Sequence, residues 1–259
     1  MTGGFRIDNI DGKNLHIDPG PGALIRTYQF GFKPKEIDAI IVSHNHTDHY
    51  NDAEVLIETM TRGVTEKNGH IIASETVLHG KNGIGPGISQ YHQSKSEIHT
   101  LKPNTTYKID NITIKGTETR HSDPTGVGFQ IEINGIKISY TSDTEYFEEL
   151  AEYHKDADIL IASVLRERRD EAMKYHMNAN EFEKLVSQIS PKLAIMTHLG
   201  MRMINSDPIT IAKSIYHNTG VFIIAARDGL HINLDEFFKK PIENQKKEFY
   251  KLLPKKDIP

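Results

Sequence analysis

The sequence contains no cysteine in its 259 residues. This absence excludes disulfide bonds, iron–sulfur clusters and zinc sites built from thiolates. Any metal ion that the protein binds must therefore be held by histidine, aspartate or glutamate. The chain has 14 histidines, a high number for one chain, and they are the first indication of its function.

Long hydrophobic runs are also absent. The most apolar stretches, 37–42 and 221–226, are far shorter than the roughly 20 residues needed to span a bilayer. The N-terminus shows no basic segment followed by an apolar run, which is the pattern of a Sec-type signal peptide. We therefore expect a cytoplasmic protein with no membrane partner.

A surplus of positive charge is missing too. The chain has 31 lysines and arginines against 35 aspartates and glutamates, which gives a formal net charge of −4. This balance argues against a basic protein that coats nucleic acid, although it is compatible with a local basic patch. Hydrophobic residues make up 37% of the chain, a low share that still suffices to close a core at this length.

The first half of the chain is rich in hairpin signals. Short apolar runs are joined by Asp110-Asn111 and by Asn134-Gly135, which predict hairpins over 106–119 and 126–141. Apolar runs also predict buried strands at 36–44 and 70–74, with a helix at 51–61 between them. Residues 80–96 form a Gly-rich polar loop, and 144–155 are typical of a helix.

The second half alternates strands with helices. We predict strands at 159–163, 193–197 and 221–226, helices at 178–189 and 207–218, and a strand at 230–234 paired with its predecessor. Asp207 is a candidate cap for the helix that it precedes. Because neither an internal repeat nor a linker is visible, we predict one domain over 1–235, with helices packed outside two sheets. A charged helix or tail follows at 236–259.

The main chemical signal is the string SHNHTDHYND, which directly follows the buried strand at 36–44. Alternate residues of an extended backbone point the same way, so His44 and His46 can address one metal ion. Asp48 and His49 follow as the chain turns into a helix and can reach a second ion. Imidazole suits zinc and several other divalent ions, and carboxylates complete such sites.

The segment 44–49 resembles the H-x-H-x-D-H signature of the metallo-β-lactamase superfamily at every specified position. The resemblance implies an α/β fold, the four-layer αββα sandwich, with a dinuclear metal site at the edge of the sheets. Asp18, in HIDPGPG, matches an upstream aspartate that supports the ligand loop in this family. A simple turn residue is the alternative interpretation of Asp18.

Other motifs of the superfamily follow in order. His121 in ETRHSDPTGVGF and Asp143 in ISYTSDTEY match a histidine ligand and a bridging aspartate. His198 in LAIMTHLG matches the last histidine, and His231 in ARDGLHINL is a competitor for that role. The resemblance implies two ligand sets that share one carboxylate: His44, His46 and His121; Asp48, His49 and His198; and Asp143 between them.

The same resemblance implies two divalent metal ions per chain. Zinc is the favoured ion, with manganese and iron as alternatives. A hydroxide bridging the two ions would attack phosphorus or a carbonyl carbon, so the chain is predicted to be an enzyme, a metal-dependent hydrolase. Asp48 is counted among the catalytic residues as well as among the ligands. An aspartate at position 143, in place of the cysteine of classical lactamases, resembles the phosphodiesterase and lactonase branches.

His176, in KYHMNANEF, gives a clue to the substrate. The segment resembles ribonuclease Z, in which a histidine before the equivalent helix protonates the leaving group. An ordinary loop histidine is the alternative. A phosphodiester substrate, a nucleotide or an RNA end, is therefore favoured. A lactonase, thioesterase or β-lactam hydrolase is the second hypothesis, and a non-catalytic metal-binding module is the third.

Two features argue against a complete ribonuclease Z. The sequence shows no Gly/Pro-rich basic arm that would clamp tRNA, and Leu-Gly-Met-Arg follows His198 in place of the Ser-Ser-Arg-Tyr-like continuation usual in that family. The negative net charge also argues against tight binding of a long polyanion. A basic cluster near His176 could hold an anion or be a solvated run of charge; it consists of Arg166, Arg168 and Arg169. Three histidines flank the Gly-rich loop as rim or surface residues, with substrate contact as the alternative: His79, His92 and His99. A homodimer is compatible with this interpretation.

Overall fold

The structure is a computed structural model that describes residues 4–170 and 174–239. Its contacts divide the chain into two units, residues 1–226 and residues 227–259. The extent predicted for the domain, 1–235, stays a prediction. Of the predicted charged tail, residues 236–239 belong to helix α10 (Leu234–Lys239), and 240–259 lie outside the described residues. None of the helices in the described part of the chain combines the length and apolar character that crossing a bilayer requires.

The first sheet of the larger unit has five strands in the order β1-β2-β3-β4-β5. The first pair is an antiparallel hairpin, and the other neighbours are parallel. The strands are β1 (Phe5–Ile10), β2 (Lys13–Ile17), β3 (Ala39–Val42), β4 (His70–Ala73) and β5 (Glu97–Thr100). The helices of this half are α1 (Ala23–Gln29), the 3-10 helix η1 (Pro34–Glu36), α2 (Thr47–Tyr50), α3 (Ala53–Met60), α4 (Glu75–His79) and α5 (Gln90–Gln93).

The second sheet follows the order β13-β12-β10-β9-β8-β7-β6, and the short strand β11 also pairs with β10. Its strands are β6 (Thr106–Ile109), β7 (Ile112–Glu118), β8 (Val127–Ile133), β9 (Ile136–Tyr140), β10 (Ile159–Arg166), β11 (Met177–Asn178), β12 (Leu193–Thr197) and β13 (Phe222–Ala225). Its helices are α6 (Leu150–Tyr153), α7 (Ala179–Ile189), α8 (Met201–Asn205) and α9 (Pro208–Thr219).

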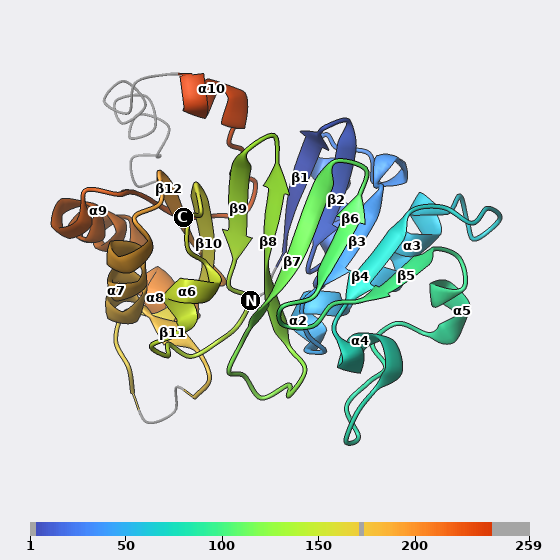
Figure 1. Cartoon of the computed structure of the whole chain (residues 1–259), viewed down its shortest axis with the longest axis horizontal. Coiled ribbons are helices and arrows are strands. Elements are labelled where there is room, and N and C mark those ends of the chain that lie inside the picture. The colour runs from blue at the N-terminus through green and yellow to red at the C-terminus, as the bar shows by residue number, and fades with distance from the viewer. Residues whose placement is uncertain (1–3, 171–173, 240–259) are drawn as a thin grey trace. The chain divides into compact units, whose positions relative to one another are not determined.

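Successive side chains of a central strand point to opposite faces of its sheet, and this alternation separates the larger unit into layers. In β3, Ile40 and Val42 pack with Leu56 of α3, whereas the intervening Ile41 is buried on the opposite face. On the other sheet, alternate residues of β10 pack with Phe182 of α7. The outer helices therefore cover the outer faces of the two sheets (Figure 1), and the predicted αββα architecture is confirmed.

The inner faces of the sheets contact each other directly. The rings of Phe5 in β1 and Tyr140 in β9 meet edge to face, with centroids 5.1 Å apart. The backbone N–H of Val127 donates to the carbonyl oxygen of Ser43 at 3.0 Å, which ties the start of β8 to the end of β3. These contacts fix the ends of the strands that carry the candidate site.

The structure corrects two predicted elements. The helix expected over 144–155 is limited to α6, and the strand expected at 230–234 is absent, because residues 230–233 have no regular structure and α10 begins at Leu234. Asn233 accepts a hydrogen bond from the N–H of Glu236 and so starts a helix where a strand was predicted. The expected hairpins and the Asp207 cap are confirmed.

Buried histidines make the stability of the fold sensitive to acid. His154 is fully buried, and burial lowers its pKa from 6.5 to about 3. The unfolded chain takes up a proton below pH 6.5 and the folded chain does not, so stability is lost as pH falls. Between pH 7 and pH 4, protonation of this one residue in the unfolded chain should lower the free energy of unfolding by about 3 kcal/mol.

We therefore expect the free energy of unfolding of His154→Gln to fall less steeply than that of the wild type as pH falls from 7 to 4. Urea unfolding with chelator present measures this free energy at each pH. His217→Gln, on the exposed side of α9, is the control and should keep the native slope. An unchanged slope in His154→Gln would contradict the burial argument.

Candidate metal centre

The predicted site residues lie just beyond the carboxyl ends of strands from both sheets. Asp18 follows β2, His44 follows β3, Asp143 follows β9 and His198 follows β12. Parallel strands deliver their carboxyl ends to the same edge, which is where α/β folds bind ligands. Asp18 and His198 have positive φ angles of 47° and 54°, conformations that cost free energy in residues other than glycine.

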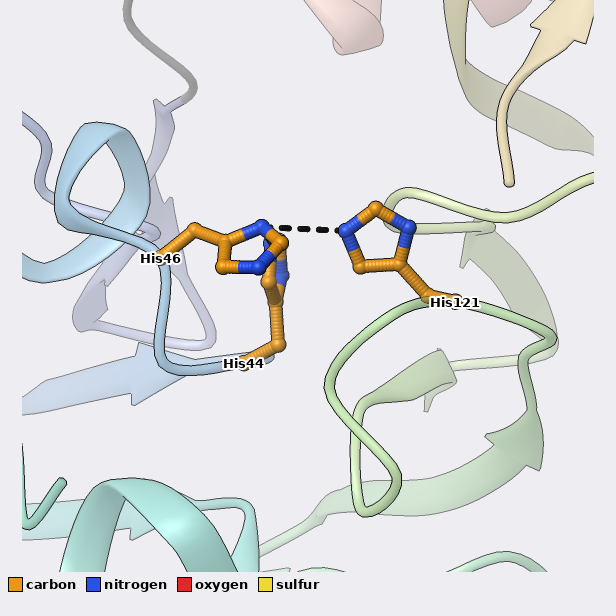
Figure 2. A group of neighbouring side chains, drawn as sticks. All are labelled: His44, His46 and His121. Atoms are coloured by element: carbon orange, nitrogen blue, oxygen red, sulfur yellow. Dashed lines mark hydrogen bonds between the residues drawn. The ribbon is translucent and has the colours of Figure 1, made fainter. Parts of the chain in front are cut away.

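Three histidines form the first group. The His44 Nε2 atom lies 3.1 Å from His46 Nδ1, and His121 Nε2 lies 3.0 Å from the same His46 nitrogen. Figure 2 shows the three imidazole rings turned toward one another, with His44 and His46 on one loop and His121 on another. Three ring nitrogens that all lie within 4.8 Å of one another have the arrangement expected of ligands on one face of a metal ion.

Asp48, His49 and His198 form the second group. The Nε2 atom of His198 lies 3.0 Å from Asp48 Oδ2, and Nε2 of His49 lies 3.7 Å from the same oxygen. The one-turn helix α2, which starts directly after His46, carries Asp48 and His49, and the His49 ring lies beside that of His44 with centroids 4.1 Å apart. His198 thus lies with Asp48 and His49, whereas His231 belongs to the second unit.

Asp143 lies between the two groups. Its Oδ2 atom is 4.0 Å from His44 Nε2, 3.3 Å from His49 Nε2 and 3.6 Å from His198 Nε2. Burial alone would raise the pKa of this carboxyl, but the positive field of His49 and His198 holds the pKa well below its ordinary value. Asp143 is therefore a carboxylate in contact with histidines of both groups.

Contacts behind the rings of three histidines fix which of their nitrogens faces the centre. His49 Nδ1 lies 3.0 Å from Asp18 Oδ2, His44 Nδ1 lies 3.0 Å from Ser43 Oγ, and His121 Nδ1 donates to the carbonyl oxygen of Tyr175 at 3.0 Å. The opposite nitrogen of each ring is thereby turned inward. An outer hydrogen bond of this kind is what orients a metal-binding histidine.

The donor set fits divalent metal ions. Burial lowers the pKa of His44 and brings the pKa of His121 to about 4, so both rings are neutral near pH 7, the form that binds metal. The buried His49 Nε2 and Asp143 Oδ1 atoms have no hydrogen-bond partner among the described residues. Because an unpaired buried polar atom is costly, these two atoms are best explained as ligands.

Asp18 supports the centre from behind. This fully buried carboxylate accepts hydrogen bonds from the Ser43 N–H at 2.7 Å, the Ser43 hydroxyl at 2.7 Å and the Tyr140 hydroxyl at 2.9 Å, in addition to its contact with His49. Ser43 in turn contacts His44, so one carboxylate positions a histidine of each group.

Replacing Asp18 with asparagine should weaken zinc binding by about 10–100-fold, the usual cost of losing an outer carboxylate. The amide cannot accept from both His49 and the surrounding hydroxyl groups. Competition with a chromophoric chelator measures the affinity. Tyr140→Phe removes only one of the bonds to Asp18 and is expected to have a smaller effect. Wild-type affinity in Asp18→Asn would refute a supporting role.

Several supporting residues of the site were not predicted from the sequence. Ser43, Ser142 and Tyr140 meet only because the two sheets face each other, and Ser142 Oγ lies 2.8 Å from Ser43 Oγ. Asp123 accepts hydrogen bonds from the N–H of Asn45 at 2.8 Å and from the Thr76 hydroxyl, which holds the 44–46 loop in place. Asp123 stands two residues after His121, and this spacing is the one hint of its role.

His176 also reaches the centre. Its Nε2 atom lies 3.3 Å from Asp143 Oδ2, while its Nδ1 donates to the carbonyl oxygen of Lys174 at 2.8 Å. Although burial acts in the opposite direction, the hydrogen bond and charge of Asp143 raise the pKa of His176. The ring thus lies at the edge of the site, next to the carboxylate between the two groups.

The other residues singled out in the sequence lie outside the two ligand groups. Arg166 pairs with Asp170, Arg168 with Glu167 at 3.6 Å and Arg169 with Glu181 at 2.8 Å. His79 contacts Thr100, His92 lies between Glu54 and Glu58, and His99 stacks on Tyr107. Each of the three arginines is therefore partnered by a carboxylate, and Arg169 also donates to the carbonyl oxygen of His176 at 3.4 Å.

Comparison with known proteins identifies the family. Residues 13–199 match the model described as the beta-lactamase superfamily domain, and the chain therefore belongs to this superfamily. It is a metallo-hydrolase of that superfamily, whose members bind divalent metal ions. The predicted family is thus confirmed.

Two relatives show the range of the similarity. The protein MJ1374 of Methanocaldococcus jannaschii is 39% identical over 236 residues, which cover 90% of this chain and 87% of the relative. A ribonuclease Z of Thermococcus gammatolerans is 24% identical over 270 residues, with 84% of each chain covered.

Solved structures share the fold. The metallo-beta-lactamase fold protein YhfI of Bacillus subtilis matches with a TM-score of 0.72 and 19% identity, covering 88% of this chain and 90% of that one. A diphosphatase of the PhnP family matches with a TM-score of 0.67 and 18% identity, covering 89% of this chain and 83% of that one. Both likenesses show the architecture.

Proposed function

We propose that this chain is a dinuclear metal-dependent phosphodiesterase that acts on a nucleotide or an RNA end. The position of Asp143 is the observation that carries the proposal, because its carboxylate contacts histidines of both groups. One carboxylate placed in this way suits two metal ions that lie roughly 3.5–4 Å apart. A single ion would be bound by only one of the two groups and would leave the other without a metal ion.

The assignment of ligands follows the geometry. One ion would be held by the first group and the other by the second, with Asp143 shared between them. Five imidazoles and two carboxylates favour zinc, with manganese and iron as alternatives. Two bound ions would lower the pKa of a shared water toward neutrality and stabilise the charge that develops on the substrate oxygen.

Other residues of the chain would orient the ligand rings and donate a proton to the leaving group. Asp18 and Ser43 fix the rings of His49 and His44, so the ligands are held in place before the ions bind. His176 is anchored through Nδ1 to the Lys174 carbonyl and turns Nε2 toward the centre. From this position Nε2 is placed to protonate a leaving oxygen.

Two observations favour a phosphodiester. The relatives include proteins named ribonuclease Z, and the structural neighbours include a diphosphatase of the PhnP family. The position of His176 also suits an alkoxide leaving group, which needs a proton more than other leaving groups do. Because the chain is negatively charged and its arginine cluster is paired, we favour a nucleotide or a short RNA end over a long polyanion.

A substrate panel on one zinc-loaded preparation tests the proposal. Turnover of a dinucleotide and of bis(4-nitrophenyl) phosphate should exceed turnover of a lactone, a thioester and a β-lactam. Chelator should abolish the activity, and zinc should restore it. Preference for the lactone, thioester or β-lactam would overturn the phosphodiester assignment and leave the metal centre in place. Inactivity toward every activated substrate would favour a non-catalytic module.

A further inference from the structure

A second group of metal-binding side chains lies apart from the candidate centre. His70 begins β4, and Glu97 and His99 belong to the neighbouring edge strand β5. In the parallel register His70 is paired with Glu97, and His99 stands two residues further along β5. Residues two apart on a strand face the same side, so all three side chains project from one face of the sheet.

The distances suit a metal ion. One potential ligand atom from each side chain lies within 4.8 Å of the other two, and His70 Nδ1 is 3.4 Å from Glu97 Oε2. Ligand atoms on a tetrahedral zinc ion with bonds of about 2.0–2.1 Å are separated by roughly 3.3 Å. Glu97 is 62% exposed, so its side chain is free to move by the small amount that coordination requires.

Tyr107 of β6, in the other sheet, holds the two histidine rings. Its ring stacks on His99, with centroids 3.4 Å apart, and its hydroxyl lies 3.2 Å from His70 Nδ1. The stacked His99 ring is therefore already held in place and loses little freedom when a ligand binds, which favours binding. At His70 Nδ1 an ion would replace the contact with the Tyr107 hydroxyl. The buried His99 Nε2 atom has no hydrogen-bond partner within the described ranges.

A cavity also lies beside the group. His99 and Tyr107 line this cavity of about 260 Å³, which gives water access to the His99 side of the group.

We propose that His70, Glu97 and His99 form a binding site for a late first-row divalent cation such as zinc. Two imidazoles and one carboxylate are a known zinc donor set, and the fourth position falls to water. The site is distinct from the candidate centre, because His70 pairs with Ala39 at the start of β3, whereas His44 follows the end of that strand. A bound ion would tie the edge strand β5 to β4.

The difference in metal content per chain between the wild type and a variant of this site tests the proposal independently of the proposed function. The full-length chain is loaded with zinc at micromolar free concentration, and metal is measured per chain by mass spectrometry. The double variant His70→Ala/His99→Ala should hold one ion fewer than the wild type, whatever number the candidate centre holds. The double variant His79→Ala/His217→Ala, which removes two exposed histidines, should hold as many as the wild type.

Equal metal content in the wild type and in His70→Ala/His99→Ala would overturn the proposal, as would binding that appears only at millimolar zinc. Glu97→Gln covers the case in which the double variant fails to fold, since this exposed substitution keeps both histidines. We expect it to weaken the affinity for that one ion at least 10-fold while phosphodiesterase turnover stays at the wild-type level. An unchanged affinity in Glu97→Gln would count equally against the site.

Discussion

Asp143→Asn is expected to lose one or both metal ions and to lower kcat/KM for phosphodiesters on the order of 10³-fold. The loss of an outer carboxylate alone costs about 10–100-fold in affinity or activity, and Asp143 contacts the ligand atoms themselves. The residue is 2% exposed, so no water can take over the role of the carboxylate. The neutral amide would leave the facing histidines without the negative charge that they share. Metal analysis and steady-state kinetics on the same preparation measure both effects.

Asp156→Asn is the matched control. Asp156 is an exposed aspartate whose carboxylate pairs only weakly with Lys137, at 3.6 Å. The same chemical change there should leave metal content and turnover at wild-type values. Full metal content in Asp143→Asn, with activity near that of the wild type, would show that this carboxylate does not join the two groups.

His176→Ala should impair substrates according to their leaving group. A ribose alkoxide is strongly basic, so cleavage of a dinucleotide should slow by about 10²–10⁴-fold without its proton donor. A nitrophenolate is stable as an anion, so the rate for a nitrophenyl phosphodiester should fall by less than about 10-fold. Parallel kinetics on the two substrates give the ratio directly.

The metal content of His176→Ala separates the alternatives. It should equal that of the wild type, because His176 lies outside both ligand groups. His217→Ala, an exposed histidine of α9, should leave both rates unchanged. Equal losses on both substrates would assign His176 a structural or binding role, and loss of metal would place it among the ligands.

The parts of the fold that were predictable are those with local causes. Asn134-Gly135 specifies its hairpin because both residues adopt the positive φ angles that the turn requires. Asp207 and Asn178 specify helix starts through their own side chains. The helix predicted over 144–155 was wrong in extent, because only α6 is helical there and the residues before it belong to the loop that follows Asp143.

The candidate site was predictable for similar reasons. Four of its side chains lie within residues 44–49, and the resemblance to a known family added His121, Asp143 and His198. The supporting contacts were not predictable. Tyr140 reaches Asp18 across 122 positions of the sequence, and Asp123 reaches Asn45 across 78. Such pairs depend on how the two sheets face each other, and no local pattern encodes that arrangement.

Anomalous X-ray diffraction from crystals of the zinc-loaded protein is the most direct test of the dinuclear centre. Data collected above and below the zinc edge locate each ion without reference to activity. We predict two peaks roughly 3.5–4 Å apart, one bound by His44, His46 and His121, the other by Asp48, His49 and His198, with Asp143 reaching both. A single peak at full zinc occupancy, or two peaks with Asp143 bound to neither, would contradict the account.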